Sequence, residues 1–443
     1  MNPEFQRYQW LEVPSHRLLS LPAVLLLVFL AAWLGGGRDV FPVVTELTIG
    51  LLVIIWGTRL AADAVLGEVV NRTWDNQRMS AMTPWDMTWG KLLGSTIYTW
   101  YGAGWCVVGF ALGVGGSLTD LLRLVMAGLE AQALALMISL LLMRRGLHSL
   151  RGQVTAAQFL AVVIVLPYVT LVQIAPGAVV PWYGLEISAT VFAFMSQMVF
   201  LAWTVGAIYW LMRVELQYPA TQWPWVVFVA FVAFYAAGFD ALLPAVLAGA
   251  GIKGMAGRLL AAFCGTILLT YAATFVEPKD PQRLKFLVNT ARAEGMVGLV
   301  DLTPTWAFGF GVAVVLGLVV VVDLMLSTPP GTTARAAVPL FVVAVLLFTV
   351  RDISMIYILV LHERARRGHS AAVVYLILVY FVAPVALSGA GQEALLPILW
   401  PNLGGPLELV VIPVLIQAVI ALVVVSQRWR AASTIQPEHA TMP

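Results

Sequence analysis

Long apolar runs recur along the whole chain and decide what it can fold into. Each run has about 20 residues, the length with which an α-helix crosses the hydrocarbon core of a bilayer. Twelve runs lie near residues 18–35, 41–58, 92–115, 120–143, 154–173, 188–211, 224–248, 257–276, 306–326, 338–361, 370–389 and 407–426. Because 60% of the residues are hydrophobic and the mean hydropathy is +0.90, we expect an all-α polytopic membrane protein with about 12 transmembrane helices.

The positions of the cations predict the orientation of these helices. If the chain starts in the cytoplasm, 19 of its 25 Lys and Arg residues fall in cytoplasmic segments and only five near the outer face, with Arg351 left inside a span. Loops on the cytoplasmic side of membrane proteins carry such an excess of Lys and Arg. We therefore predict an integral protein of the bacterial inner membrane, with both termini in the cytoplasm.

Several classes of function are excluded by composition. The net charge of +2 and the absence of a basic run interleaved with aromatic residues argue against a nucleic-acid partner. The two cysteines, Cys106 and Cys264, lie in apolar runs, so we expect neither a disulfide nor a metal site. No Ser/His/Asp set and no carboxylate pair with catalytic spacing occurs, so we predict no catalytic residues.

The two halves of the chain show similar features in the same order. EFQRYQW precedes the first apolar run and ELQYPATQW the seventh, and Thr-Pro occurs at 83–84 and at 303–304. RRGLHS follows the fourth run of the first half, and RRGHS follows the fourth run of the second. Although loops and helix ends attract such residues without duplication, three matches in register predict two six-helix halves, 1–211 and 212–443. Six helices in each half make this a parallel repeat about an axis along the membrane normal.

A polar internal segment with six charged side chains is EVVNRTWDNQRMSAMTPWDMTWGKLL, residues 68–93. It is too polar to enter hydrocarbon, yet its Trp and Met residues give it an apolar side, as in segments that lie at the membrane interface. Thr83 is a candidate N-cap, with Pro84 at the first helical position and Asp86 complementing the positive helix end. We expect a short helix, a break and a second short helix, which leads into the membrane.

Residues Glu68 to Lys91 resemble the cytoplasmic loop of ABC transporter permeases of the type-2, or exporter, class. The resemblance covers the acidic start, Arg72-Thr73, Thr83-Pro84, Asp86 and Gly90-Lys91. Chains of that family also begin with an interfacial helix, to which residues 1–17 are similar. Family members commonly have six helices and pair with a second permease, whereas this chain has 12 predicted helices. The internal repeat would resolve the difference by placing two permease halves in one chain.

The resemblance implies that the loop docks into ATPase subunits. In the first half, the coupling segment would be 62–91 and the docking residues would be Glu68, Arg72, Trp74, Asp75, Arg78, Trp85 and Asp86. Through the repeat, the second coupling segment would be 277–305, with Arg283, Arg292 and Asp301. The alternative is an interfacial segment that only anchors its neighbouring helices.

The implied partners are two ABC ATPase subunits on the cytoplasmic face, which would bind ATP and Mg. The chain contains no G-x-x-x-x-G-K-[ST] sequence with which to bind phosphates itself. We therefore predict that it is not an enzyme and needs no cofactor of its own.

Of the charged residues within apolar runs, those farthest from the run ends are Glu130, Asp240, Arg351 and Asp352. A charge in hydrocarbon costs several kcal/mol unless it is paired, protonated or near water, so such residues are candidates for a translocation path. The alternative is a structural polar contact between helices. Because adjacent helical residues point about 100° apart, we expect Arg351 and Asp352 each to find a partner elsewhere in the bundle.

Three functions fit these features. The first is the permease of an ABC exporter. The second is a secondary transporter of the major facilitator class, which also has twelve helices in two parallel halves, although the loop at 68–91 lacks the basic pattern of that class. The third is a scaffold subunit that transports nothing.

Overall fold

The computed structural model describes residues 2–112, 117–144, 150–174, 177–219, 221–239, 252, 254–277, 279, 303–361, 368–401 and 406–434. Within these ranges ten helices are long and apolar enough to cross a membrane. The protein is therefore a helical integral membrane protein, as its composition predicts. Apart from a two-stranded hairpin, the described elements are helical.

The predicted third and seventh spans differ from the other ten. They correspond to α6 (Ile97–Leu112) and α10 (Trp223–Ala237), which have 16 and 15 residues. These helices are shorter than the roughly 20 residues that cross a bilayer core. The number of membrane crossings, like the repeat, stays a prediction.

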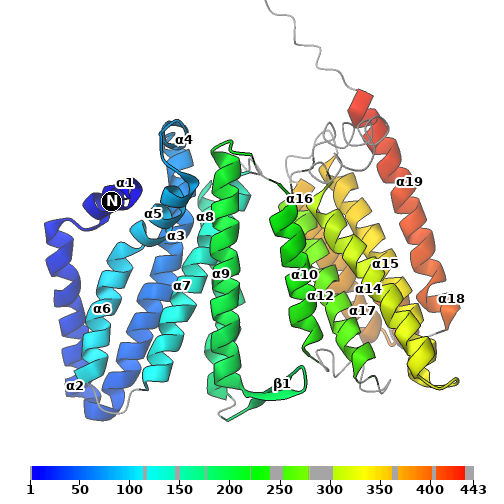
Figure 1. Cartoon of the computed structure of the whole chain (residues 1–443), viewed down its shortest axis with the longest axis horizontal. Coiled ribbons are helices and arrows are strands. Elements are labelled where there is room, and N and C mark those ends of the chain that lie inside the picture. Colours follow the sequence, from blue (N-terminus) through cyan, green and yellow to red (C-terminus); the bar gives the residue numbers. More distant parts are fainter. Residues whose placement is uncertain are drawn as a thin grey trace, which may run out of the picture. The chain divides into compact units, whose positions relative to one another are not determined.

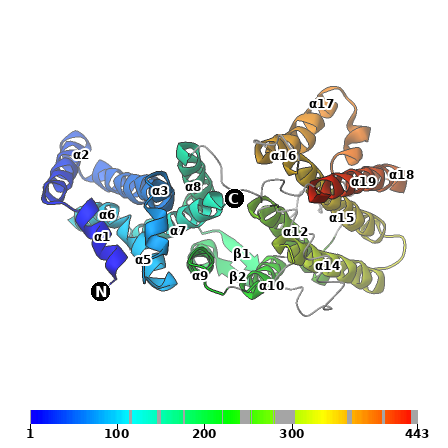
Figure 2. The same ribbon diagram turned by 90° about the horizontal axis from the view of Figure 1, so that it is seen from above.

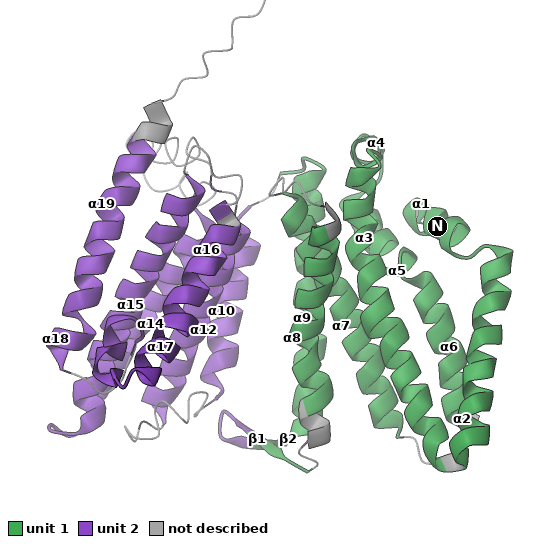
Figure 3. Cartoon of the chain, turned by 180° about the vertical axis from the view of Figure 1, so that it is seen from behind, with its two compact units in different colours: residues 1–180, 186–220 green, residues 181–185, 221–443 purple. Residues whose placement is uncertain are grey.

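The chain divides into two compact units (Figure 3). Unit 1 comprises residues 1–180 and 186–220, and unit 2 comprises residues 181–185 and 221–443. Residues 181–185 of unit 2 lie in the hairpin formed by β1 (Val179–Trp182) and β2 (Leu185–Ser188). Each unit has its own core of buried apolar side chains, so each is described by itself.

Unit 1 is built around α7 (Leu118–Met143), the most buried of its spans. Figure 2 shows this helix among α3, α8 and α9, all of which contact it. The other elements of unit 1 are α1 (Pro3–Glu12), α2 (Ser15–Gly50), the π-helix η1 (Leu51–Trp56), α3 (Gly57–Val70), α4 (Trp74–Arg78), α5 (Pro84–Gly94), α8 (Leu150–Ile174) and α9 (Ala189–Glu215).

Glycine allows the sharp turn that divides α2 into two spans. Gly37 has φ 59° and ψ −144°, a conformation that side chains with a Cβ rarely adopt. At Gly36 a Cβ would lie 2.2 Å from Cγ2 of Val40, so a larger residue does not fit there either. Beyond the turn the two spans pack together, with the rings of Phe29 and Phe41 centred 5.6 Å apart.

Side chains from neighbouring helices bind the backbone of the π-helix η1. Gln132 Nε2 of α7 donates to the carbonyl of Val53 at 2.9 Å, and Gln158 Nε2 of α8 donates to that of Ile55 at 3.0 Å. Trp100 Nε1 of α6 donates to Gln132 Oε1 at 2.9 Å. Free carbonyls are costly in hydrocarbon, so these bonds make the wide turn tolerable and join η1 to three other helices.

Unit 2 packs α12 (Met255–Val276) against α14 (Thr305–Ser327) and α15 (Thr333–Val360) around Phe263, Val320 and Val338. At Gly317 of α14 a Cβ would lie 2.7 Å from Val342 Cγ1, so this glycine permits the close approach of α14 and α15. The remaining elements are α16 (Gly368–Ile377), the π-helix η4 (Leu378–Val382), α17 (Ala383–Gly389), the 3₁₀-helix η5 (Glu393–Ile398), α18 (Leu407–Val410) and α19 (Ile412–Thr434).

We predict that Gly57→Ala destabilises unit 1. Its Cβ would lie 2.3 Å from Gln132 Nε2, so the amide must leave the Val53 carbonyl, and losing that buried bond costs about 1–3 kcal/mol. Thermal unfolding of the purified protein, followed by fluorescence, measures the effect. Gly104→Ala is the matched control, because nothing lies within 4 Å of its added Cβ. Equal melting temperatures for the two variants would show that the η1 contact is unimportant.

Candidate functional site

The segment between α3 and α6 folds into two short helices separated by a break, as predicted. Thr83 Oγ1 accepts a hydrogen bond from the backbone N–H of Asp86 at 3.1 Å, and Pro84 is the first residue of α5. The predicted helix start is therefore confirmed. Helix α1 lies at the same end of unit 1 as α4 and α5 (Figure 1), and its N-cap Asn2 donates to the Asp86 carbonyl at 2.7 Å.

Four charged side chains join α1, α3 and α5. We refer to Glu4, Arg7, Glu68 and Lys91 as the Lys91 cluster. The Lys91 side chain is fully buried, with Nζ 3.0 Å from Glu4 Oε1 and 2.5 Å from Glu68 Oε2. Arg7 pairs with both carboxylates, at 2.7 Å in the case of Glu4. The charges of the two cations and the two carboxylates thus sum to zero. A buried charge is tolerated when a counter-charge lies beside it in this way.

Polar and aromatic neighbours complete the Lys91 cluster. Burial alone would lower the pKa of Arg7, but the hydrogen bond to Glu4 and the charges of Glu4 and Glu68 raise it above its ordinary value. Burial, and then the charge of Glu68, raise the pKa of Tyr8 well above its ordinary value. Tyr8 therefore stays a neutral donor, and its hydroxyl donates to the carbonyl of Ala64 at 3.2 Å.

Helices α1 and α5 approach each other closely at two glycines. At Gly90 a Cβ would lie 2.5 Å from the Cβ of Glu4, and at Gly94 a Cβ would lie 2.9 Å from Cδ2 of Tyr8. A larger residue at either position would push α1 away from α5. The two glycines therefore let α1 bring Glu4 within reach of Lys91.

Two of the predicted docking residues are buried inside unit 1. Glu68 belongs to the Lys91 cluster and also accepts a hydrogen bond from Gln77 Nε2 at 2.8 Å. The ring of Trp74 lies 5.3 Å from Lys91 Nζ, a distance at which the cation and the ring attract each other. In this conformation both side chains hold the segment together and do not form its outer surface.

Three predicted docking residues are exposed: Arg72, Asp75 and Trp85. Arg72 occupies a left-handed turn between α3 and α4 with φ 56°, which directs the chain into α4. Met79, at the C-cap of α4, is 78% exposed. These four exposed side chains lie on α4, on the turn before it and in the first turn of α5, and we call this exposed part of the segment the α4–α5 surface.

Arg78 and Asp86 are half-buried at the edge of the α4–α5 surface. Arg78 Nε donates to the carbonyl of Glu215 at 3.0 Å and so attaches α4 to the end of α9. The second-half docking residues Arg283, Arg292 and Asp301 lie outside the described residues. Near their segment, Glu277 Oε2 accepts hydrogen bonds from the backbone N–H and the hydroxyl of Thr305, at 2.9 and 3.0 Å.

Glu4 and Lys91 were missed as interacting residues by the sequence reasoning. The available signal was a single lysine at the start of the third apolar run, where a fully buried cation needs a carboxylate. The sequence does not show which carboxylate meets it, because Glu4 is 87 residues away.

A second polar network lies inside unit 2 around Arg351 and Asp352 of α15, both of which are buried. Arg351 Nε donates to Asp352 Oδ1 at 2.8 Å, Nη1 donates to Gln417 Oε1 of α19 at 2.8 Å, and Nη2 donates to the hydroxyl of Tyr380 at 3.1 Å. As expected, each of the two residues finds partners on other helices, but the direct bond between them was not predicted. The long Arg351 side chain bends back to its neighbour, and both side chains share Tyr380.

Three tyrosine hydroxyls donate to the Asp352 carboxylate. They come from Tyr271 of α12 at 2.7 Å, Tyr375 of α16 at 3.1 Å and Tyr380 of η4 at 2.5 Å. In an α-helix, residues five apart point about 140° apart, so Tyr375 and Tyr380 would face different neighbours. The i→i+5 hydrogen bonding of the π-helix brings residues five apart closer to one face. The π-turn thus helps both hydroxyls to reach one carboxylate.

A cavity of about 300 Å³ lies beside this network in unit 2. Side chains from α12, α15, α16 and η4 line it, together with Trp400 and Pro401, and Tyr271 and Tyr380 are among them. The two tyrosines therefore form a boundary between the cavity and the buried charges. We call it the Trp400 cavity.

Of the other two candidates for a translocation path, one lies among the described residues. Glu130 is buried in α7 of unit 1, where its carboxyl interacts with the side chain of Gln197. Its Oε2 has no hydrogen-bond partner among the described residues. Asp240 lies outside the described residues, so its place stays a prediction.

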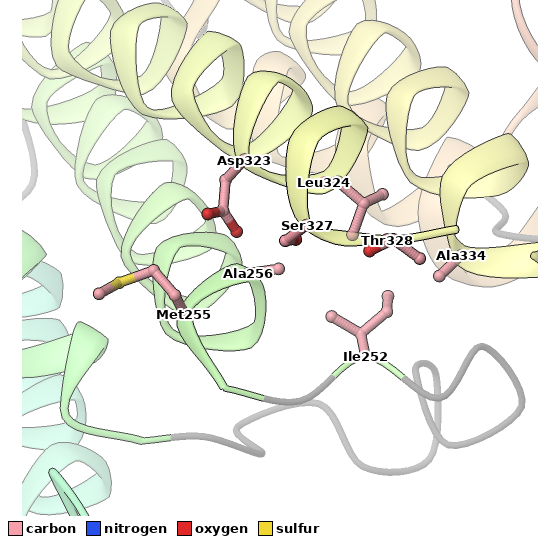
Figure 4. Close-up of a pocket in the computed structure, with 8 residues that line it drawn as sticks. All are labelled: Ile252, Met255, Ala256, Asp323, Leu324, Ser327, Thr328 and Ala334. Atoms are coloured by element: carbon pink, nitrogen blue, oxygen red, sulfur yellow. The ribbon is translucent and has the colours of Figure 1, made fainter. Parts of the chain in front are cut away.

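A further cavity of about 240 Å³ lies between the first turn of α12 and the last turn of α14 (Figure 4). Asp323 and Ser327 of α14 supply oxygen atoms to its lining, and Ile252 lies opposite them. Residues 251 and 253, on either side of Ile252, are outside the described part of the chain. We assign this cavity no role.

Comparisons with known proteins give no relative. No family model, no curated protein and no solved structure matches the chain. Function is therefore argued from the arrangement of the residues.

We predict that Lys91→Met destabilises the protein by about 3–5 kcal/mol, because it leaves buried carboxylates without their cation. Glu68→Gln combined with Lys91→Met removes one charge of each sign and should recover part of the loss. Thermal unfolding measures stability, and protease cleavage near α1 measures whether α1 separates from the rest of unit 1. Arg59→Met, at an exposed cation, is the control. A double variant no more stable than Lys91→Met would contradict the charge-balance argument.

The Arg351–Asp352 network leads to a parallel prediction. Asp352→Asn leaves Arg351 buried without a counter-charge and should cost on the order of 3–5 kcal/mol, whereas replacing both residues with apolar ones should be much less harmful. Asp39→Asn, at an exposed carboxylate, should have little effect. Melting temperatures of the purified variants test this, and a harmless Asp352→Asn would show that the pair is not held by charge.

Proposed function

We propose that this chain is the transmembrane permease of an ABC transporter, of the exporter class, which couples ATP hydrolysis by separate ATPase subunits to movement of a substrate across the membrane. The observation that carries the proposal is the α4–α5 surface. Its exposed side chains include Arg72, Asp75, Met79 and Trp85, which come from α4, the turn before it and the first turn of α5.

Coupling requires that force on this surface reach the spans, and the Lys91 cluster supports this requirement. Lys91 of α5 is bonded to Glu68 at the end of α3 and to Glu4 of α1. Helix α5 is followed directly by α6, which begins at Ile97. A partner that moves α4 and α5 would therefore move α1, α3 and α6 with them.

The composition of the surface also favours a protein partner. Trp and Arg are enriched at protein interfaces, and exposed charges around apolar side chains give an interface its specificity. Trp85 is packed edge-on against Trp89 and Tyr209, with ring centres 5.5 and 5.4 Å away. A ring held in this way loses little conformational freedom when a partner binds.

In this proposal the chain contributes two six-helix halves and two ATPase subunits dock on its cytoplasmic face. The subunits supply the nucleotide site with ATP and Mg, and the chain itself is not an enzyme. The second coupling segment, 277–305, would dock the second ATPase. Both termini would lie in the cytoplasm of a bacterial cell.

We predict that Asp75→Lys weakens ATPase binding by about tenfold or more, because a like-charge contact at an interface costs several kcal/mol. The wild-type chain is purified from native membranes, and copurified subunits are identified by mass spectrometry and by ATP hydrolysis. Glu186→Lys is the matched control, since it makes the same charge change at an exposed site in β2.

Both variants should melt like the wild type, because exposed ion pairs contribute at most about 1 kcal/mol. Retention of the ATPase by Asp75→Lys as by Glu186→Lys would remove the α4–α5 surface from the interface. If no ATPase accompanies the wild-type chain, the permease proposal fails and a secondary transporter is the next candidate.

A further inference from the structure

The Trp400 cavity is lined almost wholly by apolar groups. Ile267 of α12, Phe348 of α15 and Leu376 of α16 form its walls together with the ring of Trp400. The side-chain oxygen atoms of its lining belong to Tyr271, Thr349 and Tyr380. The cavity thus offers a ligand many carbon contacts and few polar ones.

The hydroxyl donors of the lining are already used, and the indole N–H of Trp400 is the one other side-chain donor in the lining. Tyr271 and Tyr380 donate to Asp352, and Thr349 Oγ1 donates to the carbonyl of Val345 at 2.8 Å. Arg351 lies behind the tyrosines and is neutralised by Asp352. No unpaired cation lies among these groups to hold an anionic group, and burying an unpaired charge there would be costly. The chemistry therefore selects an uncharged, apolar ligand.

The cavity is formed between membrane spans and has a partly exposed wall. Trp400 is 46% exposed, and the span that contains Leu376 and Tyr380 is the least buried of the ten, with only 6% of its apolar window covered. A volume of about 300 Å³ is at the lower end for ligand sites and suits a slender molecule. Because one side of this apolar pocket is open, an apolar ligand can reach it from outside.

We propose that the Trp400 cavity binds one hydrocarbon chain of a lipid, which enters from the bilayer beside Trp400. The chain lies against Ile267, Phe348 and Leu376. The hydroxyl oxygens of Tyr271 and Tyr380 mark the polar boundary of the site. This inference does not depend on an ATPase partner, so it stands or falls separately from the proposed function.

The test uses the full-length chain in phospholipid vesicles that contain a probe with a diazirine at the end of its alkyl chain. Two probes are compared, a diacyl phospholipid and a single-chain alcohol. After illumination, mass spectrometry locates the labelled residues. We expect labels on α12, α15 and α16 at residues that line the cavity, in addition to the lipid-facing surface.

Val345→Phe places a larger side chain in the lining and should reduce cavity labelling to background. Val343→Phe is the matched control, because Val343 lies two positions away on α15 and is 42% exposed. Cavity labelling in Val343→Phe should equal that of the wild type. Leu376→Phe, from a different wall, should act like Val345→Phe and replaces it if that variant does not fold.

The two probes distinguish the source of the chain. Cavity labelling by both supports a site for any lipid chain, and labelling by the alcohol alone supports a site for a single-chain lipid. Labelling of lining residues by neither probe in the wild type would overturn the proposal. Equal labelling of those residues in folded Val345→Phe or Leu376→Phe and in the wild type would overturn it as well.

Discussion

A charge removed from water must be balanced close by, and that constraint shapes both units of this protein. In unit 1, Lys91 is buried with two carboxylates, and Arg7 balances the second of them. In unit 2, Arg351 and Asp352 neutralise each other, and hydroxyl and amide groups satisfy their remaining hydrogen bonds. In unit 1 the charge pairs themselves join α1, α3 and α5. In unit 2 the charge pair lies within α15, and its hydrogen bonds with Tyr271, Tyr375 and Gln417 join α15 to three other helices.

Irregular backbone makes these arrangements possible. Gly37 reverses the chain between two spans, Gly90 allows α1 to approach α5, and two π-helices change the direction in which side chains point. In hydrocarbon every freed carbonyl must be bound, and Gln132 binds one such carbonyl in η1. In the π-helix η4 the irregular backbone instead positions a side chain, because it brings the hydroxyl of Tyr380 to the Asp352 carboxylate.

Periodicity and composition predict the helical membrane class because about 20 apolar residues have few alternatives to a spanning helix. Local chemistry also predicts the start of α5, since Thr83 and Pro84 act through the adjacent backbone. The Lys91 cluster could not be predicted, because its partners are separated by up to 87 residues and their meeting depends on packing. Partners on other helices were predicted for Arg351 and Asp352, but their direct bond was not, since helical wheel geometry describes where Cβ points and not where a long, flexible side chain ends.

The two networks differ in what surrounds them, and this difference suits them to different tasks. The Lys91 cluster lies beneath an exposed surface of charged and aromatic side chains, so displacement of that surface would be passed to α1 and α3. The Arg351–Asp352 network lies between spans, and its tyrosines face an apolar cavity. Because its own donors are satisfied, it offers a ligand a boundary and no charge. In these roles the protein would respond to a partner through the first network and hold a hydrocarbon chain of a lipid beside the second. Neither role needs an exposed charge inside the membrane, where exposed charge is costly.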